Sequence, residues 1–241
     1  MSASSIMTLS VINLLLRQIK MFLLHEFDIK ELNSFVCSAE KKFLSSEESN
    51  ICLQQSLITL VYEKNGTQYD VGCGVRITKD IVLTAYHIIT SIKEDLEKAY
   101  GQKQENLGFL SVADYSGNFY DLETSFLFHS SEEQDLALVK GKSFPEIKPF
   151  NIHPDLALGQ EVYILARPTG SELYQSARGL VTENIEQNHG NVVSYEYIAE
   201  VDSFPGCSGG ALVCDGALAG IIHASSFHID PGGKKKSLAS S

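Results

Sequence analysis

The sequence lacks several features that would assign it to a function class. It has no excess of positive charge, because its net charge is −11 at pH 7. A chain of that charge is not attracted as a whole to nucleic-acid phosphates. It also has no CxxC pair and no grouping of cysteine with histidine along the sequence. We therefore expect no nucleic-acid partner, no metal site and no cofactor.

Paired cysteines are also lacking, since the count is odd. The five are Cys37, Cys52, Cys73, Cys207 and Cys214, so at least one of them has no disulfide partner within the chain. Secreted proteins of this size usually carry paired cysteines. The pattern favours a reducing, intracellular compartment or a protein that folds without disulfides.

No long uninterrupted hydrophobic run is present either. Residues 6–27 are strongly apolar, but Arg17 and Lys20 interrupt them, and no basic residue precedes them. They fit a signal peptide or a membrane span poorly. Their apolar residues recur at helical spacing, which predicts an amphipathic helix within an N-terminal helical extension, residues 1–50. We favour packing of this helix on its own protein over binding to a membrane surface or a partner protein.

From about Ser56 the chain consists of short apolar runs separated by Gly, Asn, Asp and Pro. Such a pattern predicts an all-β protein, a barrel or a sandwich. A helix is expected over Ile89–Tyr100, and residues 141–158, with three prolines, look like a connector between two halves. The expected strands are Leu57–Tyr62, Gly72–Ile77, Ile81–Ala85, Leu107–Val112, Leu136–Val139, Glu161–Ala166, Gly179–Glu183, Val192–Tyr197, Ala211–Cys214 and Leu218–His223.

Three polar residues lie where acyl-transfer chemistry would need them. A serine hydroxyl is a weak nucleophile, so it requires a histidine base, an acid that orients the histidine, and donors for the oxyanion. Ser208 lies among glycines, His87 follows an apolar strand, and Asp135 opens another. Asp114 and Asp121 compete for the acid role, but neither opens a strand of this type.

These residues sit in three motifs, Leu83-Thr84-Ala85-Tyr86-His87, Asp135-Leu136-Ala137-Leu138-Val139 and Gly206-Cys207-Ser208-Gly209-Gly210. In this order they resemble the trypsin-like serine protease superfamily, over about residues 56–228. The segments Val71–Ile77 and Leu158–Tyr163 are similar to the HtrA-like branch, although no PDZ-like segment follows.

The resemblance implies a chymotrypsin-like fold of two six-stranded antiparallel β-barrels. Barrel one would span about residues 51–145 and barrel two about 150–230, within a protease domain of residues 51–241. The implied activity is that of a serine endopeptidase, which cleaves a protein or peptide substrate through an acyl-enzyme.

Carried over to this sequence, the resemblance assigns Ser208 as nucleophile, His87 as general base and Asp135 as the group that fixes the histidine tautomer. The backbone N–H groups of Gly206 and Ser208 would form the oxyanion hole. Cys207 stands where trypsin-type zymogens carry an aspartate, so activation through that ion pair is not expected. The glycine spacing makes Ser208 and not Cys207 the nucleophile, and we expect Cys207 to pack beneath the turn.

The substrate pocket is less determined. Asp202 lies where similar trypsins bind a basic side chain, whereas His223 has a setting similar to that of glutamyl endopeptidases and 3C-type proteases. Both remain candidates with Ser203, and the polar residues 230–241 leave open whether the second barrel has its last strand. An alternative function is a catalytically idle protease-fold binding module that is recruited through its N-terminal helix.

Overall fold

The structure is a computed structural model of the 241-residue chain. It describes residues 44–64, 66–92, 109–131, 135–141, 144–153, 156–169, 172–189, 192–203, 205–229 and 235–240. The predicted amphipathic helix over residues 6–27 lies outside these ranges. No helix among the described residues is long and apolar enough to cross a bilayer.

The first described element is helix α3 (Ser46–Ser56), and a capping box starts it. The Ser45 hydroxyl accepts a hydrogen bond from the Glu48 amide at 3.2 Å, and the Glu48 carboxylate accepts one from the Ser45 amide at 3.1 Å. These contacts satisfy two backbone donors that the first helical turn would otherwise leave unpaired. The helix therefore starts before residue 50, where the sequence predicted the end of the N-terminal extension, and continues past it.

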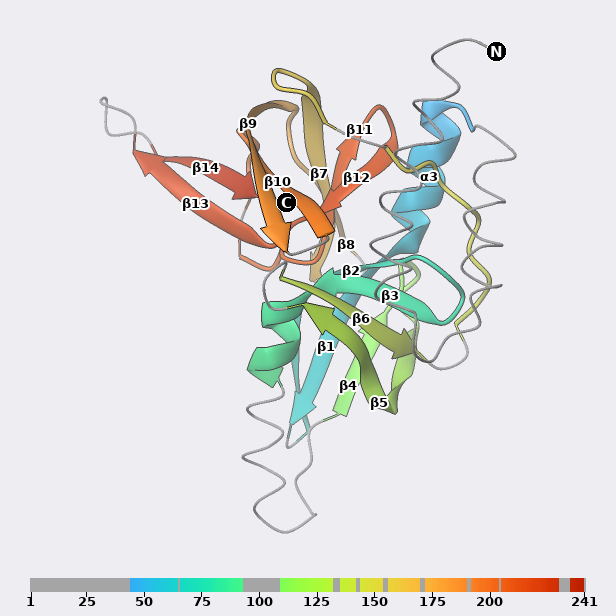
Figure 1. Cartoon of the computed structure of the whole chain (residues 1–241). Helices are drawn as coiled ribbons and strands as arrows, with labels where there is room; N and C mark the ends of the chain where they lie inside the picture. Colours follow the sequence, from blue (N-terminus) through green and yellow to red (C-terminus); the bar gives the residue numbers. More distant parts are fainter. Residues whose placement is uncertain are drawn as a thin grey trace.

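Helix α3 packs beside the second half of the chain (Figure 1). Leu53 is fully buried, and the Ser49 hydroxyl donates a hydrogen bond to the Gly216 carbonyl at 2.7 Å. The Tyr163 hydroxyl donates to the Asn50 side chain at 3.0 Å. Burial of one face, together with these polar contacts, fixes the helix to the body of the protein.

The first half is a closed barrel of antiparallel strands in the order β1-β2-β3-β6-β5-β4 (Figure 1). Its core is aliphatic: Ile58, Leu60, Val82, Val112 and Val139 are fully buried. The strands are β1 (Leu57–Lys64), β2 (Thr67–Arg76), β3 (Ile81–Ala85), β4 (Phe109–Ala113), β5 (Phe119–Ser131) and β6 (Leu136–Gly141).

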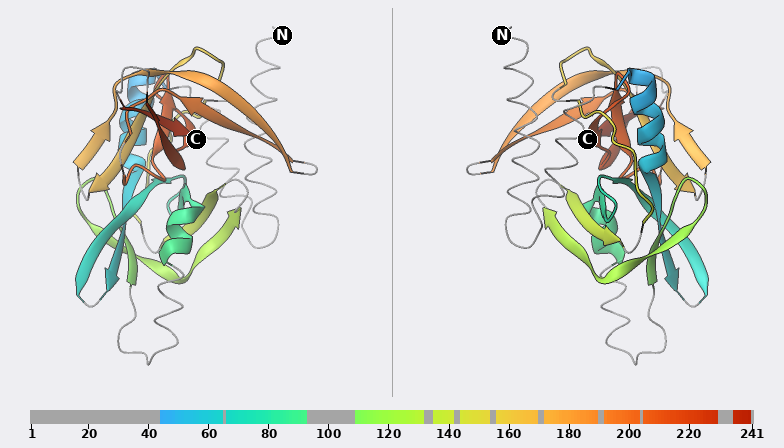
Figure 2. Two further views of the ribbon diagram at one scale, coloured as in Figure 1. Left: turned by 90° about the vertical axis from the view of Figure 1, so that its left-hand side faces the viewer. Right: turned by 90° about the vertical axis from the view of Figure 1, so that its right-hand side faces the viewer.

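The second half is an eight-stranded antiparallel sheet in the order β12-β11-β7-β9-β10-β14-β13, with β8 paired to β7. Figure 2 shows how far its long β9–β10 hairpin extends from the body. The strands are β7 (Glu161–Thr169), β8 (Glu172–Gln175), β9 (Gly179–His189), β10 (Val192–Ala199), β11 (Ala211–Cys214), β12 (Ala217–Ile221), β13 (Ala224–Ile229) and β14 (Lys235–Ser240).

The all-β, two-unit chymotrypsin-like fold is confirmed, and each of the expected strands overlaps an observed one. The sequence pattern missed β5, β8, β13 and β14. The most informative of these is β14, because it lies in the polar segment where the last strand was in doubt. Its backbone pairs with β13 along its whole length and with β10 at Ile198 and Ala199. Backbone ladder pairing with its two neighbours defines this strand.

The helix expected over Ile89–Tyr100 occupies residues 86–92 of the described chain. It begins one residue before His87, so the histidine belongs to the first helical turn. Within the predicted connector, the described residues 144–153 and 156–160 contain no strand apart from an isolated bridge between Ile152 and Leu218.

Candidate active site

Strands β3 and β6 bring His87 and Asp135 together. The two strands are antiparallel neighbours, and the end of β3 at Ala85 pairs with the start of β6 at Leu136. The residues just beyond these ends must therefore meet. His87 Nδ1 lies 2.7 Å from Asp135 Oδ2, and the His87 amide donates to Asp135 Oδ1, also at 2.7 Å.

The backbone of Asp135 adopts the left-handed region, with φ 48°. Aspartate is one of the few residues other than glycine that tolerate this conformation. The Asp135 carbonyl accepts a hydrogen bond from the Tyr86 amide at 2.9 Å. Both carboxylate oxygens and the backbone of Asp135 are thus engaged with residues 86–87, which orients the imidazole.

The turn that carries Ser208 is held by glycines on either side. Gly206 and Gly209 have φ of 100° and 80°, values that a residue with a Cβ rarely adopts. A Cβ at Gly209 would also collide with the Cys73 carbonyl oxygen. Cys207 is 1% exposed, so the prediction that it packs beneath the turn is confirmed.

Cys73 in β2 links this turn to the first barrel. Its amide donates to the Ser208 carbonyl at 2.8 Å, and its thiol donates to the Gly206 carbonyl at 3.0 Å. The same sulfur accepts the Arg167 amide at 3.3 Å, and the Cys73 carbonyl accepts the Thr84 hydroxyl at 2.6 Å. Burial raises the pKa of the Cys73 thiol far above its usual value, so the group stays protonated and can act as a donor.

Two further contacts bring the serine turn near the His87–Asp135 pair. Gly72 is so placed that a Cβ on it would contact both the Ile88 side chain and the Ser208 carbonyl. The Gly209 amide donates to the Ile222 carbonyl at 2.6 Å, and the next residue, His223, reaches Asp135. No hydrogen bond joins the Ser208 hydroxyl to His87 among the described side chains.

The predicted oxyanion donors are the amides of Gly206 and Ser208. Within the described part of the chain neither amide donates a hydrogen bond, whereas those of Gly209 and Gly210 both do. An amide that has no internal acceptor is available to a ligand.

The three predicted pocket residues differ in their surroundings. Asp202 is exposed, and its carbonyl accepts the Tyr174 hydroxyl at 2.8 Å. Ser203 is half-buried. The His223 side chain is 19% exposed, and its Nδ1 lies 3.7 Å from Asp135 Oδ2. His223 thus approaches the same carboxylate oxygen that contacts His87.

Glu196 in β10 is a site residue that sequence reasoning missed. Its Oε1 lies 3.6 Å from His223 Nε2, so the His223 imidazole stands between two carboxylates. In sequence, Glu196 is an ordinary polar residue of an alternating strand and carries no motif. Glu196 is recognised only in the structure, where β10 runs beside the segment that follows β12.

Asp114, which competed for the acid role, lies in the β4–β5 turn. Its carboxylate accepts hydrogen bonds from the Ser116 amide at 2.8 Å, the Asn118 amide at 3.0 Å and the Tyr120 hydroxyl at 3.1 Å. Burial opposes its ionised form, but the hydrogen bonds from Asn118, Ser116 and Tyr120 hold its pKa below the usual value. The contacts of Asp114 stabilise this turn. The side chain of Asp121, the other residue that competed for the acid role, lies outside the described residues.

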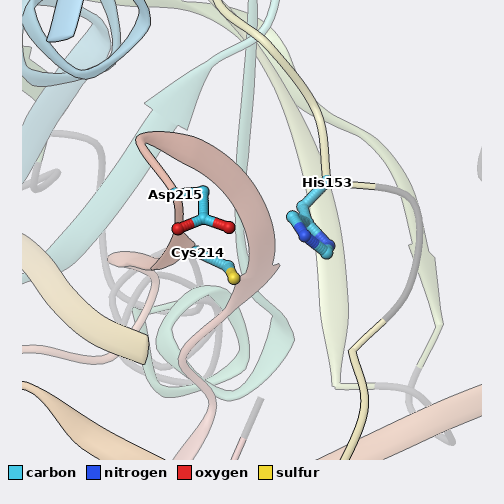
Figure 3. Close-up of side chains that lie close together, drawn as sticks. All are labelled: His153, Cys214 and Asp215. Atoms are coloured by element: carbon cyan, nitrogen blue, oxygen red, sulfur yellow. The ribbon is translucent and has the colours of Figure 1, made fainter. Parts of the chain in front are cut away.

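Among the described residues, the structure brings together one group of potential metal ligands that the sequence spacing did not indicate. His153, Cys214 and Asp215 each offer a ligand atom, and these atoms lie within 4.8 Å of one another (Figure 3). The cluster joins residues that are far apart in sequence, so their spacing gave no signal. The four described cysteines, Cys214 among them, are free thiols.

Comparisons with known proteins agree with this fold. The inactive form of a serine-to-alanine mutant of Rv3671c from M. tuberculosis H37Rv is similar, with a TM-score of 0.54, 15% identity, and coverage of 82% of this chain and 88% of that chain. The apo MamO protease domain from Magnetospirillum magneticum gives a TM-score of 0.54, 18% identity, and coverage of 78% of this chain and 92% of that chain. At such identities the similarity concerns the fold.

The sequence itself establishes the family. No curated protein shows significant sequence similarity to the chain. The model of the trypsin-like peptidase domain matches residues 72–221. That match covers more than half of the chain and includes all three motifs that predicted the resemblance. The chain therefore belongs to the family of trypsin-like peptidase domains.

Proposed function

We propose that this protein is a serine endopeptidase that cleaves peptide bonds through an acyl-enzyme, with His87, Asp135 and Ser208 as its catalytic residues. Membership of a peptidase family already implies a peptide or protein substrate. The observation that carries the proposal is the double contact between Asp135 and His87 at 2.7 Å. A carboxylate on Nδ1 leaves the lone pair on Nε2, where a general base needs it.

In the proposed reaction the Ser208 oxygen attacks the carbonyl carbon of the scissile bond while its proton passes to His87 Nε2. The negative charge that develops on the carbonyl oxygen is stabilised by the amides of Gly206 and Ser208. His87 then protonates the leaving amine, and the C–N bond breaks. A water molecule, deprotonated by His87, hydrolyses the ester and restores the Ser208 hydroxyl. Asp135 stabilises the imidazolium in both halves of the reaction.

Labelling with a fluorophosphonate tests the proposal without a known substrate. We expect wild-type protein to form a covalent adduct, Ser208→Ala to form none, and Ser116→Ala to label like wild-type. Ser116 is a suitable control because it is exposed in the β4–β5 turn, where only its amide contacts Asp114. Absence of labelling in folded wild-type protein, or labelling that survives Ser208→Ala, would contradict the proposed nucleophile.

The alternative is a protease-fold binding module with an idle site. The observation that favours it is the lack of a hydrogen bond from Ser208 to His87 among the described side chains. Catalytic hydrogen bonds are often long before a substrate binds, so this observation carries less weight than the His87–Asp135 geometry. The same fluorophosphonate experiment separates the two functions, because an idle site would not label.

The proposed primary pocket is bounded by Asp202, Ser203 and His223. The exposed Asp202 favours a basic substrate side chain, whereas His223 favours an acidic one. The proximity of Glu196 to His223 opposes acidic substrates, because a second carboxylate would have to compete with Glu196 for the imidazole. We therefore expect cleavage after basic residues to depend on Asp202. Cleavage of a peptide library by Asp202→Ala and by His223→Ala would show which of these two residues sets the preference.

A further inference from the structure

The His153–Cys214–Asp215 cluster lies on two segments that the fold holds side by side (Figure 3). His153 belongs to the connector between the two halves. Cys214 ends β11, and Asp215 is the first residue of the turn that follows. The cluster is separate from the proposed catalytic site, because β11 runs from the Ser208 turn at one end to Cys214 at the other.

Backbone contacts fix the connector beside the β11–β12 hairpin. The His153 amide donates to the Leu218 carbonyl at 2.7 Å, and the Leu218 amide donates to the Asn151 carbonyl at 2.9 Å. The Ile152–Leu218 bridge lies between these two hydrogen bonds. His153 is therefore anchored opposite the hairpin through its main chain.

The turn itself sets the position of the carboxylate. Asp215 and Gly216 both have positive φ, of 48° and 74°, as expected for a two-residue Asp-Gly hairpin. The register is tight, because Cys214 pairs with Ala217. The thiol and the carboxylate are thus presented by consecutive residues of a rigid turn, while the imidazole comes from the facing segment.

The three groups are a nitrogen, a sulfur and an oxygen donor, a set that matches the preferences of Zn²⁺. Ca²⁺ and Mg²⁺ prefer oxygen ligands alone. In a tetrahedral zinc site with bonds of about 2.0–2.3 Å, neighbouring donor atoms lie about 3.4–3.6 Å apart. The ligand atoms of the cluster lie within 4.8 Å of one another, a limit about one ångström longer than these distances. Rotation of the exposed Asp215 side chain can close that difference.

A neighbouring glutamine contacts the imidazole. The Gln160 amide donates to His153 Nε2 at 3.2 Å. Its other end is held, because Gln160 Oε1 accepts the Ala157 amide at 3.0 Å. A fixed polar side chain therefore lies beside the imidazole, and zinc that binds His153 Nε2 would take the place of this contact.

We propose that His153, Cys214 and Asp215 bind one Zn²⁺ ion, with water as the fourth ligand, and that the ion ties the connector to the β11–β12 hairpin. Zinc binds the thiolate, so the Cys214 proton is released to solvent as the Zn–S bond forms. The ion would stabilise the end of β11 opposite the Ser208 turn. The proposal does not depend on peptidase activity.

Metal binding to the full chain tests this inference directly. The protein is stripped with a chelator, reloaded with Zn²⁺ alone, desalted and analysed for zinc and for thermal unfolding. We expect one bound ion per chain and a higher unfolding temperature. Co²⁺, used as a spectroscopic substitute, should give the thiolate charge-transfer band and the intense visible bands of a tetrahedral site.

Two variants test the proposed ligands, and a third is the control. Cys214→Ser and Asp215→Asn should each weaken zinc binding at least about tenfold, and Cys214→Ser should also lose the thiolate–cobalt band. Asp215→Asn guards against misfolding, since asparagine fits the same turn conformation. Cys52→Ser, at a buried cysteine of α3, should bind as wild-type does. Failure of wild-type protein to retain zinc, or unchanged zinc affinity and cobalt spectrum in both cluster variants, would overturn the proposal.

Discussion

Replacement of Asp135 by asparagine tests the geometry of the proposed catalytic residues most sharply. Asparagine fits the left-handed backbone of this position, and its oxygen can still accept the His87 amide. Its NH₂ group would then take the place of Oδ2, 2.7 Å from His87 Nδ1. Two donors cannot face each other, so the imidazole proton must move to Nε2.

The expected loss of catalytic activity follows from that change of tautomer. With a proton on Nε2, His87 cannot accept the Ser208 proton, although the oxyanion amides and the fold remain. In a Ser-His-Asp triad such a change lowers turnover by ~10⁴, which corresponds to about 5 kcal/mol of transition-state stabilisation. The free energy of unfolding should change far less, because the variant keeps the backbone conformation and one of the two hydrogen bonds.

The second-order rate of fluorophosphonate labelling measures this loss without a substrate. Asp80→Asn is the matched control, since the Asp80 carboxylate forms a surface ion pair with Lys79 at 3.7 Å, and the variant should label at the wild-type rate. Circular dichroism establishes that both variants are folded. If folded Asp135→Asn labels within about tenfold of wild-type, the assignment of Asp135 to the histidine tautomer is wrong.

Three further predictions concern other parts of the molecule. Asp114→Asn should lower the free energy of unfolding by about 1–3 kcal/mol at neutral pH. Hydrogen bonds lower the folded-state pKa of Asp114, so its contribution to stability is present above its unfolded pKa of about 4 and is lost as pH falls through the folded value. In urea titrations at several pH values, the free energy of unfolding should therefore fall less steeply with acid in the variant than in wild-type protein. An equal fall would contradict this. Glu196→Gln should raise kcat/KM for substrates with Glu before the scissile bond relative to those with Lys, and an unchanged ratio in a peptide library would exclude Glu196 from the pocket. Gly209→Ala should destabilise the fold by more than about 1–2 kcal/mol, because its Cβ would meet the Cys73 carbonyl; an unchanged urea midpoint would refute this.

The elements that the sequence predicts well are those with a local signal. Strands β3 and β11 have the predicted boundaries, because an apolar run of four or five residues bounded by turn residues is too short for a helix and is typical of a buried strand. The positions of His87 and Asp135 follow from the same signal, since they flank two apolar strands. That these two strands are neighbours was implied by family resemblance and not by any local pattern.

The elements that the sequence does not predict depend on partners distant in the chain. Strand β14 is polar and exists through its pairing with β13 and β10. Glu196 contacts His223, and His153 joins Cys214, only because separate strands bring them together. Composition and periodicity describe one segment at a time, so contacts of this kind require the topology.

The hydrogen bonds of Cys73 also couple the folding of the two halves. The turn that presents Ser208 belongs to the second half, yet its carbonyl groups at Gly206 and Ser208 are held by a residue of the first. A fragment containing only the second half would leave both carbonyls without these donors. The nucleophile should therefore become reactive only after both halves have assembled. Separately produced fragments, split within the connector, should accordingly label with fluorophosphonate when mixed and not when alone.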